Sequence, residues 1–241
     1  MQLFYNPDIT PNAYCPLDPE ESRHAVRVLR MREGDELYVT DGKGNLYRCQ
    51  IVEANDKACV VNVIAQEFSI FNSQFLIHLA VAPTKNPSRM EWLVEKAVEI
   101  GVGEITLLQC DHSERSFLKT DRLEKLAVSA MKQSLHTVLP KINPAVKLTD
   151  WLNSSPDTHQ SSLKFIAHCE ADKPRTPLAA ALKPGKDAVV LIGPEGDFSE
   201  EEIALALACG FQPVSLGPSR LRTETAALYA VVAFNLINDR S

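Results

Sequence analysis

Two successive units of strand, glycine-bearing loop and helix occupy the stretch from Ala188 to Ala227. One apolar run, Ala188 to Ile192, ends at Gly193-Pro194-Glu195-Gly196, and a second, Pro213 to Leu216, ends at Gly217-Pro218. Glycines directly after strands let the backbone approach a ligand closely, and in parallel sheets such loops lie along one carboxyl edge. The pattern predicts an α/β fold with a pocket between two neighbouring loops.

Either loop alone is more typical of an ordinary tight turn between a strand and a helix. Two such loops in succession favour a functional site, because polar residues also crowd the start of the second helix. These residues are Arg220, Arg222, Glu224 and Thr225.

The charges around the first loop indicate the kind of ligand. Ser199 and Glu202 form an S-x-x-E capping box, which satisfies a helix start that could otherwise bind a phosphate. Neither G-x-x-x-x-G-K-[ST] nor G-x-G-x-x-G occurs after a strand. A neutral or cationic ligand fits better, because the nearby carboxylates would repel a phosphate. They belong to Glu195, Asp197, Glu200, Glu201 and Glu202.

The hydrophobic pattern divides the chain into a small β-rich domain, residues 1–70, and an α/β domain, residues 73–241. In the first domain, strands are predicted at 36–40, 46–53 and 58–64, with a hairpin turn at 41–45. The stretch 66–73 loses periodicity and is interpreted as the linker.

Alternating strands and helices follow the linker, as in an α/β domain with a largely parallel sheet. Strands are predicted at 75–82, 104–110 and 163–168. Ser88 is expected to cap a helix that Gly101 ends, and Asp121 to open a second helix that ends before Pro140. The last helix, Thr223 to Asn238, is too apolar for a surface helix, which indicates either the core or a dimer interface.

An arginine stripe is predicted on a short helix from Glu21 to Met31. Arg23, Arg27 and Arg30 are spaced by four and three residues, so they share one helical face. Spacing alone slightly favours a solvated face paired with neighbouring glutamates over a nucleic-acid contact. His24 is interpreted as a structural surface residue.

Composition narrows the function classes. The net charge of −6 argues against a protein that wraps nucleic acid by bulk electrostatics, so any RNA contact must rest on a local basic feature. Six scattered cysteines show none of the spacings of zinc sites, and no metal is expected. No apolar run approaches the ~20 residues of a membrane span, and no signal peptide is evident, so a cytosolic protein is expected.

The two loops also carry a specific resemblance. LIGPEGDFSEEE followed by SLGPSRLRTETAAL resembles the paired signature of the SPOUT class of RNA methyltransferases, which use S-adenosylmethionine. Within that class the chain is similar to the ribosomal RNA small subunit methyltransferase E family, which methylates N3 of a uridine in 16S rRNA. The similarity spans nearly the whole chain, through HAVRVLRMREGDEL, VAPTKNPSRMEWLVEKAVEIGV, HSERS and KQSLHTVLPKI. The cofactor is a sulfonium cation, which agrees with the acidic loop.

The resemblance implies an architecture and a set of contacts. It implies a small PUA-like β-barrel domain, a SPOUT domain with a trefoil knot, and a homodimer that acts on 16S rRNA or the small ribosomal subunit. The residues that it implies for the cofactor are Ala167, His168, Cys169, Ile192, Gly193, Pro194, Glu195, Gly196, Leu216, Gly217, Leu221, Thr225 and Ala226. Those implied for RNA are Arg23, Arg27, Arg30, Lys85, Arg89, Arg115 and Ser116.

Arg222 and Glu224 are the catalytic candidates. Uridine N3 must lose a proton, so Arg222 could stabilise charge on the uracil oxygens while Glu224 takes the proton or orients the arginine. A salt bridge between these two residues, within the helix or across a dimer, is an equally good interpretation. The chain departs from the family pattern at Asp197, usually glycine, at Ser219-Arg220, usually Arg-Ile, and at His136, usually arginine.

Two rival functions stay open at this point. One is an RNA-binding protein that has kept the fold and lost catalysis. The other is a related SPOUT methyltransferase that acts on tRNA or on a ribose 2′-OH, which would leave the base nitrogen unmodified.

Overall fold

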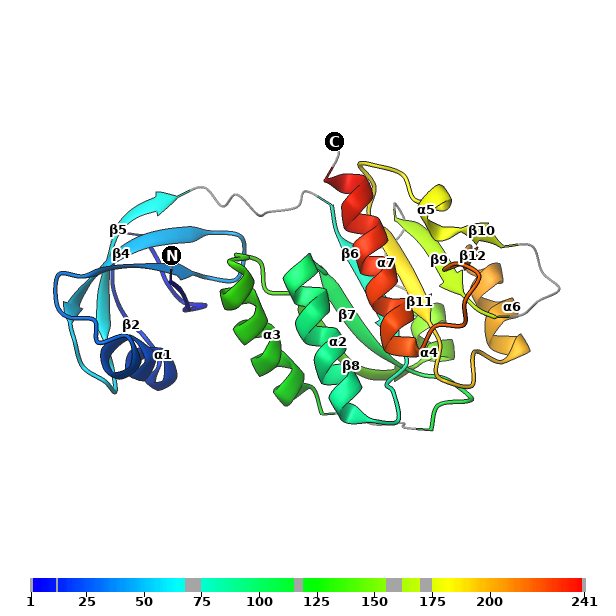
Figure 1. The fold of residues 1–241 in the computed structure, drawn as a ribbon, viewed down its shortest axis with the longest axis horizontal. Coiled ribbons are helices and arrows are strands. Elements are labelled where there is room, and N and C mark those ends of the chain that lie inside the picture. The colour runs from blue at the N-terminus through cyan, green and yellow to red at the C-terminus, as the bar shows by residue number, and fades with distance from the viewer. Residues whose placement is uncertain are drawn as a thin grey trace. The chain divides into compact units, whose positions relative to one another are not determined.

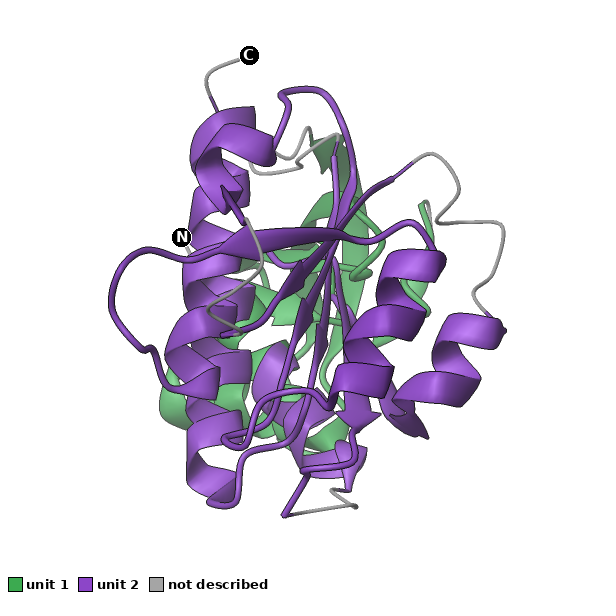
Figure 2. Cartoon of the chain, turned by 90° about the vertical axis from the view of Figure 1, so that its right-hand side faces the viewer, with its two compact units in different colours: residues 1–72, 128–139 green, residues 73–127, 140–241 purple. Residues whose placement is uncertain are grey.

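The protein consists of two compact units (Figure 2). Unit 1 comprises Met1–Asn72 and Val128–Leu139, and unit 2 comprises Ser73–Ala127 and Pro140–Ser241. The structure is a computed structural model that describes residues 2–11, 13–67, 75–114, 119–154, 162–169 and 175–239. The predicted domain boundary lies within 68–74, outside the described residues, and it stays a prediction.

Unit 1 is built on a five-stranded sheet in the order β1-β3-β4-β5-β2, curled into half a barrel (Figure 1). Strand β1 runs parallel to β3, and the other neighbours are antiparallel. The predicted strands are present, although the third starts later and ends later than expected. Two three-residue strands were too short for periodicity to reveal. The bounds are β1 (Leu3–Tyr5), β2 (Tyr14–Pro16), β3 (Glu36–Thr40), β4 (Leu46–Glu53) and β5 (Val60–Glu67).

The helical segment of unit 1 differs from the prediction. Asp18 caps α1 (Pro19–Arg23), which continues as the π-helical turn η1 (His24–Val28). Arg30 lies beyond the helix with a left-handed φ of 58°, so the three arginines do not form one helical stripe. A π-turn widens the helix and changes which residues share a face. Spacing counted at 3.6 residues per turn could not anticipate this change.

The segment Val128–Leu139 packs with unit 1, although the sequence assigned it to the second domain. The Thr40 hydroxyl donates to the Thr137 carbonyl at 3.1 Å, and the Leu139 amide donates to the Gly42 carbonyl at 2.8 Å. Lys132 pairs with the buried Glu21, and burial raises the pKa of that carboxyl. Tertiary hydrogen bonds of this kind leave no periodic signal in the sequence.

Unit 2 contains a seven-stranded parallel sheet in the order β10-β12-β9-β11-β6-β7-β8. Helices cover both faces, with α2 and α7 on one and α4 and α6 on the other (Figure 1). Strands β6 and β11 are buried along their whole length, as expected at the centre of a parallel sheet. The strands are β6 (Ile77–Val81), β7 (Glu104–Gln109), β8 (Lys141–Lys147), β9 (Leu163–Ala167), β10 (Thr176–Pro177), β11 (Ala188–Ile192) and β12 (Gln212–Ser215). Its helices are α2 (Pro87–Ile100), α4 (Leu148–Asn153), α5 (Leu178–Ala181), α6 (Glu200–Ala208) and α7 (Thr223–Asn238), whereas α3 (Thr120–Ser134) begins in unit 2 and ends in unit 1.

Helix ends were predicted with mixed success. Helix α6 begins with the predicted capping box of Ser199 and Glu202, and Gly101 ends α2 with a φ of 107°. The expected cap of α2 is wrong, because the Asn86 side chain accepts from the Ser88 amide and Pro87 opens the helix. Asparagine followed by proline supplies both the capping acceptor and a preset φ at the first helical position.

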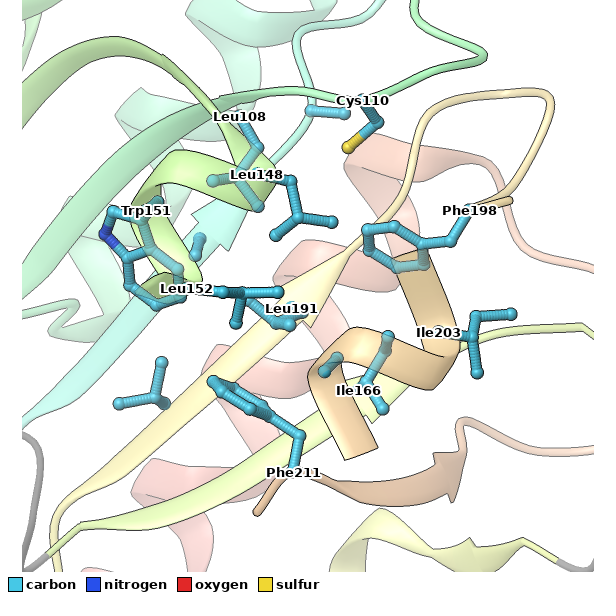
Figure 3. Close-up of a cluster of buried hydrophobic side chains, with 14 residues drawn as sticks. Leu108, Cys110, Leu148, Trp151, Leu152, Ile166, Leu191, Phe198, Ile203 and Phe211 are labelled. Atoms are coloured by element: carbon cyan, nitrogen blue, oxygen red, sulfur yellow. The ribbon is translucent and has the colours of Figure 1, made fainter. Parts of the chain in front are cut away.

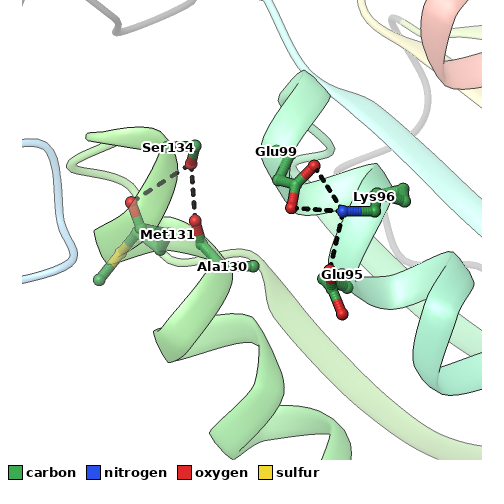
Figure 4. A network of polar contacts seen from close by, with 6 residues as sticks. All are labelled: Glu95, Lys96, Glu99, Ala130, Met131 and Ser134. Carbon is green, nitrogen blue, oxygen red and sulfur yellow. Dashed lines mark hydrogen bonds and ion pairs between the residues drawn. The ribbon is translucent and has the colours of Figure 1, made fainter.

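Polar contacts near the exposed helix surfaces are local (Figure 4). Within α2, Lys96 donates to Glu95 and Glu99 at 2.8 Å each. At the end of α3, the Ser134 hydroxyl donates to the Ala130 carbonyl at 2.8 Å. Surface ion pairs contribute little, about 0–1 kcal/mol each. The fold of unit 2 therefore depends mainly on its buried apolar side chains.

One apolar cluster joins α4 and α6 to their face of the sheet (Figure 3). Leu191 of β11 lies inside this cluster with Ile203 of α6 and Trp151 of α4. The strand that precedes the first glycine loop is thereby held on this face by two helices. Among the described residues, no helix is both long enough and apolar enough to span a bilayer.

Replacing the fully buried Leu191 by alanine should lower the free energy of unfolding by about 2–5 kcal/mol, because a cavity replaces buried methyl groups. Urea denaturation of the full chain measures this change. The matched control is Leu207→Ala on α6, where the side chain is 36% exposed, and its effect should be much smaller. Equal effects of the two variants would contradict this packing.

Candidate functional site

A cavity of about 800 Å³ opens at the carboxyl edge of the unit 2 sheet. It is formed by the ends of β9, β11 and β12 and by the start of α7. The two glycine loops flank this cavity as predicted, although β9 lies between their strands. The lining residues are Ala167, His168, Cys169, Arg175, Ile192, Gly193, Pro194, Glu195, Asp197, Val214, Ser215, Leu216, Gly217, Pro218, Ser219, Arg220, Leu221, Arg222, Thr223 and Ala226.

Most of the residues predicted for the cofactor line this cavity. Gly196 and Thr225 do not, and neither does Glu224. Sequence reasoning missed Arg175, which directly follows Pro174 in the sequence, and it gave no ligand role to Thr223. The structure therefore brings the predicted loops together, while the roles of the individual residues stay predictions.

The first loop is held against the start of α7. The Thr223 hydroxyl donates to the Gly193 carbonyl at 3.1 Å, and both groups are buried. A Cβ on Gly193 would lie 3.1 Å from the Phe198 ring, so this position favours glycine. Gly217 in the second loop has a φ of 109°, which glycine adopts without strain. Gly193 is thus packed closely against Phe198, and Gly217 has a backbone conformation that other residues adopt only with strain.

The carboxylates of the first loop and of the start of α6 are engaged by neighbouring backbone groups. Glu195 accepts from the Lys85 amide at 3.0 Å, and Asp197 accepts from the Cys169 amide at 2.7 Å. Glu202 accepts from the Asp111 amide at 3.0 Å and from the Ser199 amide at 2.9 Å. These residues therefore join loops to each other, a role that sequence reasoning did not anticipate.

The charge around the cavity also differs from the prediction. Glu195 and Asp197 line it, but so do three arginines, which are Arg175, Arg220 and Arg222. Glu200, Glu201 and Glu202 do not line it. The lining therefore does not carry the net negative charge from which a cationic ligand was expected. It offers both carboxylates and guanidinium groups, which suits a ligand with charges of both signs.

Glu224 pairs with Arg89 of α2 at 3.6 Å, and no ion pair joins it to Arg222 among the described residues. Its side chain is buried, and its Oε2 accepts no hydrogen bond within the described part of the chain. The alternative of a salt bridge between Arg222 and Glu224 within one subunit is therefore not found among the described residues, and a salt bridge across a dimer stays untested. Arg89, which was predicted to face RNA, pairs with this carboxylate while its side chain stays 36% exposed, and its contact with RNA stays a prediction.

The remaining basic residues predicted to contact RNA are dispersed. In unit 1, Arg27 pairs with Asp56, while Arg23 and Arg30 are exposed. In unit 2, Lys85 pairs with Glu114 at 2.6 Å, and this contact raises the pKa of the lysine. Arg115 and Ser116 lie outside the described residues. A contact of these residues with RNA stays a prediction.

Comparison with known proteins identifies the family. A model of the RNA methyltransferase domain matches residues 72–235, and a model of the RNA methyltransferase PUA domain matches residues 17–64. Ribosomal RNA small subunit methyltransferase E of Buchnera aphidicola is 28% identical over 96% of this chain and 91% of its own length. The chain belongs to the ribosomal RNA small subunit methyltransferase E family.

Solved structures agree with this membership. A probable rRNA methyltransferase from Porphyromonas gingivalis is 42% identical, with a TM-score of 0.91 over 100% of this chain and 99% of that one. Ribosomal RNA small subunit methyltransferase E from Neisseria gonorrhoeae, bound to S-adenosyl methionine, is 26% identical, with a TM-score of 0.84 over 99% and 98%. The predicted α/β SPOUT-type fold with a PUA-like N-terminal β-domain is therefore confirmed for this member of the methyltransferase E family.

Replacing Gly196 by alanine should destabilise the first loop, because the new Cβ would lie 2.9 Å from the Cβ of His112. Overpacking of this kind typically costs about 1–3 kcal/mol, measurable as a lower midpoint of thermal unfolding. Adding His112→Gly removes the opposing Cβ and should restore much of the loss. If Gly196→Ala left the midpoint of thermal unfolding unchanged, the close approach to His112 would not be what requires glycine at this position.

Proposed function

We propose that this chain uses S-adenosylmethionine to methylate N3 of a uridine in 16S rRNA of the small ribosomal subunit. One observation carries the proposal. A cavity bounded by two glycine loops lies at the carboxyl edge of three parallel strands, in a family member that shares nearly its whole fold with a relative solved with S-adenosyl methionine. Methylation of ribosomal RNA by this chain also implies a cytoplasmic location.

The cavity fits such a cofactor in size and chemistry. Its volume of about 800 Å³ suits a ligand of this size, since small-molecule pockets span ~300–1,000 Å³. Ile192, Leu221 and Ala226 offer apolar contacts for an adenine ring, and the glycine loops offer backbone groups that can read its edge. The Arg220 guanidinium suits the carboxylate of the methionine moiety, while the Glu195 carboxylate suits its amino group.

Arg222 is the residue to which we assign stabilisation of charge in the reaction. When bound, S-adenosylmethionine supplies an electrophilic methyl group. Uridine N3 must release its proton, to water or to a carboxylate, as it attacks, and negative charge then develops on the neighbouring uracil oxygens. Arg222 lines the cavity at the start of α7, where its guanidinium can donate hydrogen bonds to those oxygens.

Glu224 is a weaker candidate for the proton acceptor. Its Oε2 accepts no hydrogen bond within the described part of the chain, so that atom could receive a proton. Its side chain does not line the cavity, however, and it pairs with Arg89 on the neighbouring helix α2. We therefore propose that Glu224 chiefly fixes the start of α7, so that Arg222 is held at the cavity.

We also propose that the protein forms a homodimer through one face of α7. Tyr229 and Leu236 are exposed there by 41% and 55%, although nine other residues of this helix are buried. They border an apolar groove of about 350 Å³ that also involves Ala179 and Ile237. A second copy of this face would remove these side chains from water, which favours association.

Loss of the gene should abolish N3 methylation of one uridine in 16S rRNA, and the wild-type gene should restore it. Mass mapping of rRNA from the two strains measures the modification and identifies the position. A missing mark in tRNA or on a ribose 2′-OH would instead support the related methyltransferase. Unchanged rRNA and tRNA, together with RNA binding by the purified protein, would support the non-catalytic alternative.

The same complementation with Arg222→Ala should leave the uridine largely unmethylated, because an uncompensated anion would form in the transition state. Removal of such a donor typically slows turnover by about 10²–10³-fold. Calorimetry with S-adenosylmethionine should show binding close to that of the wild type, which separates catalysis from cofactor affinity. Normal turnover by this variant would reject the catalytic assignment.

Replacing Leu236 by arginine should convert the dimer to a monomer, because a charge would be buried in the apolar face. Sedimentation velocity at several protein concentrations measures the change in mass. The control is Leu207→Arg, a partly exposed leucine on α6, which should leave the mass unchanged. A wild-type protein that sediments as a monomer at high concentration would refute the proposed dimer.

A further inference from the structure

We propose that Asp197 and Arg175 are positioning residues that clamp one peptide group, the one between His168 and Cys169, at the wall of the cavity. This inference rests on the proposed function in so far as the cavity is taken to bind S-adenosylmethionine. The clamp itself is visible in the protein alone.

The two charged side chains engage the two polar ends of the same peptide. Asp197 Oδ2 accepts from the Cys169 amide at 2.7 Å. The Arg175 guanidinium donates from Nη1 to the His168 carbonyl. The carbonyl of one residue and the amide of the next belong to a single rigid plane. Holding both ends therefore fixes the orientation of that plane.

The backbone and the side chain of Asp197 are both held in the position that the clamp requires. Its φ of 65° lies in the left-handed region, which aspartate tolerates better than most residues. The other carboxylate oxygen, Oδ1, accepts from the Phe198 amide at 2.9 Å, so the side chain is held from a second direction. The Asp197 carbonyl lies 3.1 Å from His112 Nδ1, and its amide donates to the Pro194 carbonyl at 3.0 Å. Each polar group of Asp197 is thereby engaged.

The clamp has a consequence for ligand recognition. An amide has one proton, and that of Cys169 is already donated to Asp197, so it is not free to bind a ligand. The hydrogen bond from Arg175 in turn orients the His168 carbonyl. A cofactor at this wall thus meets a carbonyl whose direction is set before binding. Such preorganisation increases affinity, because the ligand does not have to order the loop.

The first test is hydrogen exchange of the Cys169 amide in the ligand-free, full-length protein, resolved by NMR. Cys169 is an exposed residue, so its amide should be protected mainly by Asp197. Asp197→Gly keeps the left-handed backbone accessible but removes the acceptor, and exchange should accelerate by roughly tenfold or more. Asp197→Asn retains a neutral acceptor and should give an intermediate rate. Equal rates in all three proteins would overturn the clamp.

The second test is the affinity for S-adenosylmethionine, measured by calorimetry. Asp197→Gly and Arg175→Met should each weaken binding by roughly tenfold, with partial rescue in Asp197→Asn. The double variant should lose less than the product of the two single effects, because both act on one peptide. In methyl transfer, the KM for the cofactor should rise while kcat changes little. Multiplicative effects, or unchanged affinity, would overturn the positioning role.

Two variants serve as controls for the removal of charge. Glu201→Gln and Lys183→Met alter exposed side chains that do not line the cavity, and both should bind the cofactor as the wild type does. If wild-type protein fails to bind S-adenosylmethionine, the proposed function fails, whereas the exchange rates still decide whether the clamp exists. Binding by the wild type with no change in the clamp variants would reject the clamp's role and leave the proposed function standing.

Discussion

The cavity depends on hydrogen bonds between carboxylates of one loop region and the backbone amides of three neighbouring loops. Glu195 accepts from the loop after β6, Asp197 from the end of β9, and Glu202 from the loop after β7. A bond to a charged group is stronger than one between neutral groups, about 1.5–3 kcal/mol. The loop after β11 and the start of α6 are therefore the common support of the carboxyl edge. Without these hydrogen bonds, the loops would not hold the cavity in one fixed shape.

This arrangement explains why the acidic stretch was misread from the sequence. Charge alone suggests a surface that repels phosphate and attracts cations, and the five carboxylates were counted together as one acidic cluster beside the ligand. Glu202 closes the predicted capping box, but it also accepts from the Asp111 amide, and it is almost completely buried. The partner amides lie about 90 to 110 residues away along the chain for two of the three acids. No local pattern records such pairings.

Features set by local physical chemistry were predictable. The bounds of β11 and α7 agree with the sequence because an unbroken apolar run, a glycine and a dense apolar helix are local signals. The capping box of α6 follows from two side chains three residues apart. The place of β9 between the strands of the two glycine loops was not predictable, because it depends on the path of the whole chain.

The candidate site shows the same division between local and long-range information. Its glycine loops were located from the sequence, yet the partner of Glu224 was not, because Arg89 belongs to a helix over a hundred residues earlier. The pairing also changes the chemistry that each residue can perform. A carboxylate held beside an arginine outside the cavity is poorly placed to remove a proton from a bound base, whereas it can hold the start of α7. This arrangement favours a role for Arg222 in the reaction, because neighbouring residues fix its backbone while its side chain lies at the cavity. The different roles of Arg222 and Glu224 therefore follow from their burial as much as from their residue types.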